Sequence, residues 1–66
     1  MHLTVNGKPR QVESSLTLLS FLESLGVNPK LVAVEHNGDI IRRENFETVT
    51  LAEGDVLEII HMVGGG

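Results

Sequence analysis

The sequence contains no cysteine, tryptophan or tyrosine, and two phenylalanines are its only aromatic residues. Without cysteine there can be no disulfide, thiolate zinc site, iron–sulfur cluster or cysteine nucleophile. Basic residues number only 5 against 9 acidic ones, so the basic and aromatic surfaces of nucleic-acid-binding proteins are missing. No apolar run approaches the roughly 20 residues of a membrane span. We therefore expect a cytoplasmic protein that binds neither nucleic acid nor membrane.

The 66 residues, 41% of them hydrophobic, suffice for one domain with a small core. Leu3 and Val5 alternate with polar residues, which predicts a strand that ends in the hairpin signal Asn6-Gly7. The return strand is expected over about 10–13. Apolar residues spaced three and four apart then predict a helix that Thr17 caps and that ends at Gly26. These apolar residues are Leu18, Phe21, Leu22 and Leu25.

The second half of the chain reads as strands and turns, with strands expected at 31–35, 40–41 and 56–63. Between the last two, residues 42–50 are polar and irregular, with Phe46 as their anchor in the core. Because Ile59 and Ile60 make the last strand apolar on both sides, we expect it at the centre of the sheet, beside the first strand.

The order of these elements predicts an α+β fold of the β-grasp type. A mixed sheet of four to five strands would carry one helix packed across one face. We expect this domain to span residues 1–63 and to be followed by a flexible glycine tail at 64–66.

The three glycines Gly64, Gly65 and Gly66 are the most unusual feature of the sequence. They are either a frayed end or a slim tail that threads a channel too narrow for side chains. Such a tail would deliver the Gly66 carboxylate, which becomes an acyl donor once it attacks the α-phosphate of ATP. The sequence has no Walker-type phosphate loop and no cysteine, so other proteins must supply the activation and the sulfur. We therefore predict a carrier that binds no cofactor itself, rather than an enzyme.

No catalytic or metal-binding constellation is predicted elsewhere. The histidines His2, His36 and His61 lack ligand spacing, and His36 is expected to be a hydrogen-bonded residue at a strand end. His2 and His61 could approach each other if the first and last strands pair, and no site is assigned to them. The carboxylates are scattered over turns, which argues against an acid–base pair.

A partner-docking surface is predicted beside the tail. Alternation along the last strand places Ile60 and Met62 on the open face of the sheet, and two apolar side chains together beside a functional tail suggest docking. Arg43 is added as a contact for phosphate or carboxylate. In the alternative interpretation, the loop that carries Phe46 covers Ile60 and Met62, and Arg43 is a solvated loop residue.

Several segments together resemble the ThiS family of sulfur carrier proteins of thiamine biosynthesis. They are VAVEHNGDII at 32–41, Arg43, LAEGDVLEII at 51–60 and the ending VGGG at 63–66. The resemblance extends over essentially the whole chain. One departure is Arg42, which stands where the family commonly has a proline. The conformation of the loop at 42–50 therefore does not follow from the resemblance.

The resemblance implies a ubiquitin-like β-grasp fold and a chemical role for Gly66. A ubiquitin-activator-like adenylyltransferase of the ThiF type would use ATP to adenylate the Gly66 carboxylate. Sulfur from a cysteine desulfurase would convert the adenylate to a thiocarboxylate, and a ThiG-type thiazole synthase would receive that sulfur. Two alternatives stay open: a carrier for another pathway, such as the small subunit of molybdopterin synthase, and a ubiquitin-like interaction or modifier module.

Overall fold

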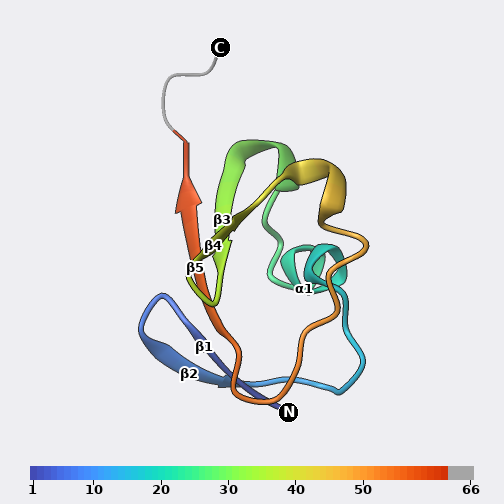
Figure 1. Cartoon of the computed structure of the whole chain (residues 1–66), viewed down its shortest axis with the longest axis vertical. Coiled ribbons are helices and arrows are strands. Elements are labelled where there is room, and N and C mark those ends of the chain that lie inside the picture. The colour runs from blue at the N-terminus through green and yellow to red at the C-terminus, as the bar shows by residue number, and fades with distance from the viewer. Residues whose placement is uncertain (63–66) are drawn as a thin grey trace.

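The computed structural model describes residues 1–62, which form one α-helix, a five-stranded mixed sheet and two short 3-10 helices (Figure 1). The strands are β1 (His2–Val5), β2 (Lys8–Gln11), β3 (Val32–His36), β4 (Asp39–Ile41) and β5 (Val56–His61). The helices are α1 (Leu18–Ser24), η1 (Pro29–Leu31) and η2 (Arg43–Asn45). The predicted α+β arrangement of the β-grasp type is confirmed.

Strand β5 lies at the centre of the sheet, whose order is β2-β1-β5-β3-β4. It runs parallel to β1 and antiparallel to β3, so the predicted pairing of the first and last strands is confirmed. The ladder ends at His61, earlier than the predicted end at Val63, which lies outside the described residues.

Helix α1 begins and ends as its sequence predicts. The Thr17 hydroxyl accepts a hydrogen bond from the Ser20 backbone N–H at 3.1 Å. At the other end Gly26 adopts φ +74°, and the Val27 N–H donates to the Leu22 carbonyl at 3.1 Å, which closes a Schellman motif. No helix within residues 1–62 has the length and apolar character needed to cross a membrane.

The core lies between α1 and one face of the sheet. Buried strand residues that point to α1 alternate with partly or fully exposed ones. The loop after β4 closes the core with the buried side chain of Phe46, as predicted. The buried apolar residues are Leu3, Val5, Leu18, Phe21, Leu22, Val32, Val34, Phe46, Leu51, Leu57 and Ile59. Residues 42–50 are less irregular than expected, because they contain η2 and a bridge from Thr50 to Thr17.

The predicted position of the return strand was wrong by two residues. It is β2 at Lys8–Gln11, and Val5 pairs directly with Lys8. Asn6 and Gly7 have φ of 51° and 81°, as a two-residue hairpin turn requires. Such a short turn leaves no residues for a loop before Pro9, which β2 tolerates because it is an edge strand.

Candidate functional site

The predicted site lies where the chain leaves the central strand. Gly64, Gly65 and Gly66 are outside the described residues, as is the predicted boundary between the domain and its tail. The structure describes the part of the fold that precedes them, namely the end of β5 and Met62 beside the start of β3, which we call the platform. His61 pairs with Val32, and the Met62 N–H donates to the Leu31 carbonyl at 2.9 Å. The chain is therefore held to the start of β3 as far as Met62.

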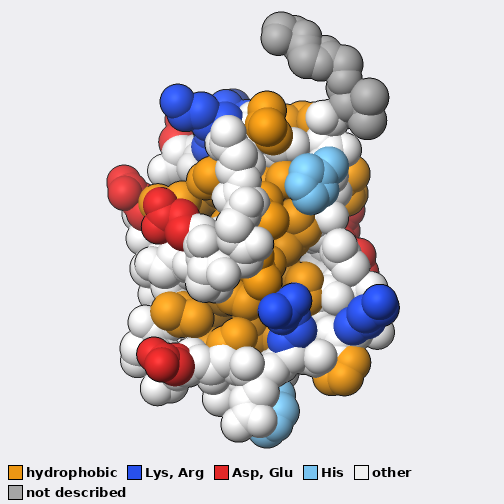
Figure 2. All heavy atoms as spheres, turned by 180° about the vertical axis from the view of Figure 1, so that it is seen from behind, with side chains coloured by type: hydrophobic (Ala, Val, Ile, Leu, Met, Phe, Trp, Pro, Cys, Tyr) orange, Lys and Arg blue, Asp and Glu red, His pale blue; other side chains and the backbone are white. Residues whose placement is uncertain are grey.

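Arg43 contacts the segment that leads into β3. Its Nη2 donates to the Lys30 carbonyl at 3.0 Å, one residue before the carbonyl that receives the Met62 N–H. The structure thus brings Arg43 close to the end of β5, although 19 positions separate Arg43 from Met62 in the sequence. Figure 2 shows Lys and Arg side chains in two separate groups, one at the top of this view of the protein body and one in its lower half.

Ile60 and Met62 are half-exposed, at 52% and 51%, so the loop that carries Phe46 does not cover them. Sequence reasoning missed three further exposed apolar residues: Leu31, at the end of η1, and Ile40 and Val56, which lie in strands of the sheet. Ile40 lies on β4 opposite Glu35, and Val56 lies on β5 opposite Thr4. The period of two that places Ile60 outward would also have found Val56.

The conformation at Arg42 resolves the question raised by the missing proline. Arg42 adopts φ −71° and ψ 145°, which is the polyproline II region that a proline also occupies. Its Nε lies 3.2 Å from Glu44 Oε1, and both side chains are largely exposed. The loop that positions Arg43 is therefore built in the backbone conformation that a proline would impose.

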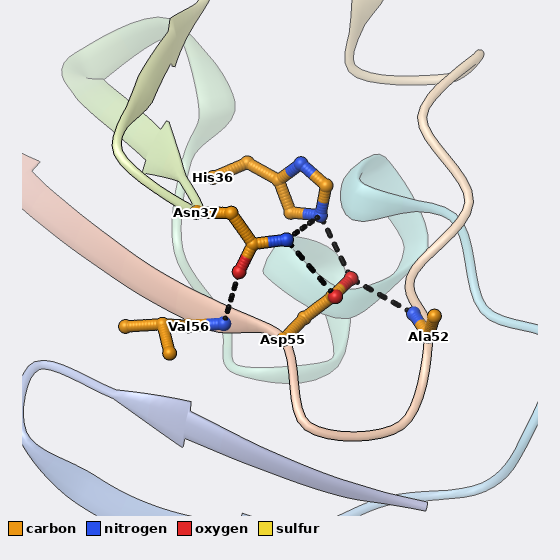
Figure 3. Close-up of polar contacts among 5 residues, drawn as sticks. All are labelled: His36, Asn37, Ala52, Asp55 and Val56. Carbon is orange, nitrogen blue, oxygen red and sulfur yellow. Dashed lines mark hydrogen bonds and ion pairs between the residues drawn. The ribbon is translucent and has the colours of Figure 1, made fainter.

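A polar cluster ties the β3–β4 turn to the turn before β5 (Figure 3). His36 Nε2 lies 2.7 Å from Asp55 Oδ2, and it is the donor because a carboxylate only accepts. Asp55 also accepts from Asn37 Nδ2 at 3.1 Å and from the Ala52 N–H at 2.9 Å. Asn37 Oδ1 accepts from the Val56 N–H at 2.8 Å. The expectation of a hydrogen-bonded His36 at a strand end is confirmed.

The environment of Asp55 lowers its pKa. Burial, the largest single influence, raises the pKa, but the hydrogen bonds from His36, Asn37 and Ala52 and the charge of His36 together outweigh it. Because its acceptor sites are filled by donors of this chain, Asp55 has a structural role.

The remaining histidines do not meet. Because β1 and β5 are parallel, His2 lies beside the turn before β5, where its Nδ1 is 3.2 Å from Glu53 Oε2. His61 lies at the far end of β5, so the expected approach of His2 to His61 was wrong. The backbone N–H of His2 also donates to Glu53 and lowers the pKa of that carboxyl. Within residues 1–62 no three His, Asp or Glu side chains are grouped as a metal site would require.

Comparison with known proteins gives a match over nearly the entire chain. The model of the ThiS family matches residues 3–66. The "Sulfur carrier protein ThiS" of Bacillus subtilis is 40% identical over 65 residues, which cover 97% of this chain and 98% of that protein. The crystal structure of the thiamine biosynthesis protein ThiS from Geobacter metallireducens superposes with a TM-score of 0.88 at 42% identity and full coverage of both chains.

The chain also matches part of a larger protein. It is 39% identical over 66 residues to a "Thiazole synthase" of Magnetococcus marinus, and the match covers 100% of this chain but 20% of that protein. The chain thus spans about a fifth of the length of this relative.

Proposed function

Because the chain belongs to the ThiS family, we propose that it is a sulfur carrier of thiamine biosynthesis whose Gly66 carboxylate is converted to a thiocarboxylate. The chain acts as a cytoplasmic co-substrate that separate enzymes activate and unload. One observation carries the proposal: the family match runs from the first strand through to Gly66 and so includes both the folded platform and the glycine tail.

The proposed chemistry begins with the activation of a poor acyl donor. A Gly66 carboxylate oxygen attacks the α-phosphorus of ATP, the bond from that phosphorus to the bridging oxygen breaks, and pyrophosphate leaves. A persulfide sulfur then attacks the acyl carbon of the adenylate and displaces AMP. A second thiol reduces the resulting acyl disulfide and forms a disulfide with the donor, which leaves the thiocarboxylate on Gly66.

Three partners follow from this chemistry. An adenylyltransferase of the ThiF type binds ATP and activates the carboxylate, a cysteine desulfurase supplies the persulfide, and a thiazole synthase of the ThiG type accepts the sulfur. The match to part of a protein named thiazole synthase supports the last partner. The absence of cysteine from this chain agrees with a sulfur source on another protein.

The platform around the end of β5 is the proposed docking surface for these partners. Ile60 and Met62 supply half-exposed apolar contacts. Arg43 uses Nη2 on the Lys30 carbonyl, and a guanidinium has further N–H groups that can reach a partner. Gly64, Gly65 and Gly66 then enter the active site of the partner, because glycine lacks the side chain that a narrow channel would exclude.

The direct test is the intact mass of the chain after incubation with ATP, the adenylyltransferase, the desulfurase and cysteine. We expect a gain equal to the replacement of one oxygen by sulfur, located at Gly66 by fragmentation. Deletion of Gly66 should abolish this gain and leave the free energy of unfolding within about 0.5 kcal/mol of the wild-type value. Linkage of Gly66 to a lysine of another protein would instead establish a modifier, and an unchanged mass would refute the carrier role.

Arg43→Ala tests the docking surface, with Arg42→Ala as the matched control that removes the same charge from the neighbouring position. We expect Arg43→Ala to raise the KM for the carrier in adenylation severalfold and Arg42→Ala to change it less than twofold. Equal KM values for the two variants would remove Arg43 from the docking surface.

A further inference from the structure

Two carboxylates lie side by side on the face of the sheet that α1 does not cover. Glu35 on β3 pairs directly with Glu58 on β5. Both residues alternate with buried neighbours, namely Val34 and Leu57, so their side chains point to the open face. Residues directly opposite each other have Cβ atoms about 5 Å apart, and like charges there are destabilising.

No group of the described chain compensates this repulsion. Within residues 1–62 no ion pair or side-chain hydrogen bond includes the carboxylate of Glu35 or of Glu58. The basic residues of the edge strand are on the other side, because Lys8 is opposite the buried Val5 and Arg10 is opposite the buried Leu3. The strand residues of the open face therefore carry two negative charges and no lysine or arginine.

Apolar side chains lie next to both carboxylates. Ile40 lies directly opposite Glu35 on its other side. Along β5, Val56 and Ile60 flank Glu58 on the same face, and both are about half-exposed, at 43% and 52%. A partner that covers this face would exclude water from the carboxylates, which strengthens a charged contact made there and raises the cost of leaving them unpaired.

We propose that Glu35 and Glu58 form an acidic docking point for an arginine or lysine that projects from an apolar surface of the adenylating enzyme. A planar guanidinium suits two neighbouring carboxylates best, because its N–H groups can donate to both. The pair thereby makes recognition specific on a face whose aliphatic residues alone would bind apolar surfaces with little discrimination.

Charge disfavours the other occupants of this face. A second copy of the chain that packs through the same face would bring another Glu35–Glu58 pair close to the first. Nucleic acid and anionic lipid carry the same sign of charge as the carboxylates and would be repelled. A protein surface that is apolar and locally basic is the occupant that complements both the aliphatic residues and the two carboxylates.

This inference rests on the proposed function. The adenylating enzyme is chosen as the partner of the acidic docking point because adenylation comes first in the reaction sequence. The chain with a free Gly66 carboxylate has to be recognised by the enzyme that adenylates it before any later transfer. Docking by a surface on the folded body also leaves the glycine tail free to enter the active site.

The test measures the dissociation constant for the adenylating enzyme by calorimetry, without ATP, for the wild type and two double variants. Glu35→Gln with Glu58→Gln removes the acidic pair. Glu13→Gln with Glu23→Gln is the matched control, because it removes the same charge at exposed residues outside the strands. We expect the first double variant to weaken binding about tenfold or more and the control to weaken it less than twofold.

Two readouts separate recognition from folding and from the proposed chemistry. The Glu35→Gln, Glu58→Gln variant should unfold at the same or a higher temperature than the wild type, since a like-charge repulsion has been removed. It should still reach the wild-type adenylation rate when the carrier is saturating. Equal weakening by both double variants, or by neither, would overturn the acidic docking point even if the wild type acquires sulfur. A wild type that is never adenylated would refute the carrier role, and the binding comparison would still decide the docking point.

Discussion

The two faces of the sheet differ in how completely their groups are paired. On the covered face, aliphatic side chains pack against α1, and within residues 1–62 no buried side-chain nitrogen or oxygen lacks a hydrogen-bond partner. On the open face, aliphatic side chains are half-exposed, and two carboxylates face each other without a counter-charge. Stability is thus concentrated on one face, and the other face keeps the unpaired groups that a partner can use.

Two carboxylates illustrate this difference between paired and unpaired groups: one in the turn before β5 and one within β5. Asp55 is 9% exposed and accepts hydrogen bonds from three residues of its own chain. Glu58, three positions later, is exposed and pairs across the ladder with another glutamate. The same functional group therefore stabilises the fold at one position and is available for binding at the other.

The largest expected effect contrasts Leu57→Ala with Ile60→Ala, which shorten large aliphatic side chains on opposite faces of β5. Leu57 is fully buried, so its truncation should cost about 2–5 kcal/mol of unfolding free energy. Ile60 is half-exposed, so its truncation should cost less than about 1 kcal/mol. Urea unfolding followed by far-UV circular dichroism measures both, since the chain has no tryptophan to report by fluorescence. Equal losses would mean that the two faces contribute alike to stability.

An intermediate effect on the free energy of unfolding is expected when the carboxylates of Asp55 and Glu58 are replaced, one at a time, by amides. Asp55→Asn places an amide N–H₂ among donors and removes the charge that His36 binds, which should cost about 1–3 kcal/mol. Glu58→Gln removes a repulsion and should leave the stability unchanged or raise it by up to about 1 kcal/mol. Thermal and urea unfolding of the two variants under one set of conditions provide the comparison. A loss in Glu58→Gln as large as that in Asp55→Asn would show that Glu58 also has a structural role.

The smallest effect is the acid dependence that Asp55 imparts. Its folded-state pKa lies below the unfolded value of 3.8, so its stabilising contribution is complete above pH 3.8 and is lost as the pH falls through the folded pKa. The difference in stability between the wild type and Asp55→Asn should therefore shrink as the pH is lowered below 3.8. Unfolding in urea at a series of pH values tests this, and a difference that does not change with pH would contradict it.

Local patterns predicted the elements of this fold well, because each depends on residues close together in sequence. The Thr17 cap, the stop at Gly26 and the Asn6-Gly7 turn were recognised from single residues or pairs. The position of β2 was missed, since Lys8–Gln11 has no alternation of buried and exposed residues, and only the tight turn and the pairing with β1 place it.

Part of the geometry around the candidate site was predicted from the sequence. Ile60 and Met62 followed from the period of two along the last strand, but the contact of Arg43 with the Lys30 carbonyl joins segments 13 residues apart. The pairing of Glu35 with Glu58 depends on the register between β3 and β5. Neither contact leaves a signal in the sequence close to either partner.

The sequence by itself determined the kinds of elements and their order, because turn residues, caps and hydrophobic period act over a few neighbouring positions. It also carried the family signature that extends to Gly66. Only the tertiary structure decided which residues face each other across β5: the donors around Asp55, the separation of His2 from His61, and the two glutamates on the open face. Strand register and direction set these contacts, and both are chosen by burying one complete face of the sheet.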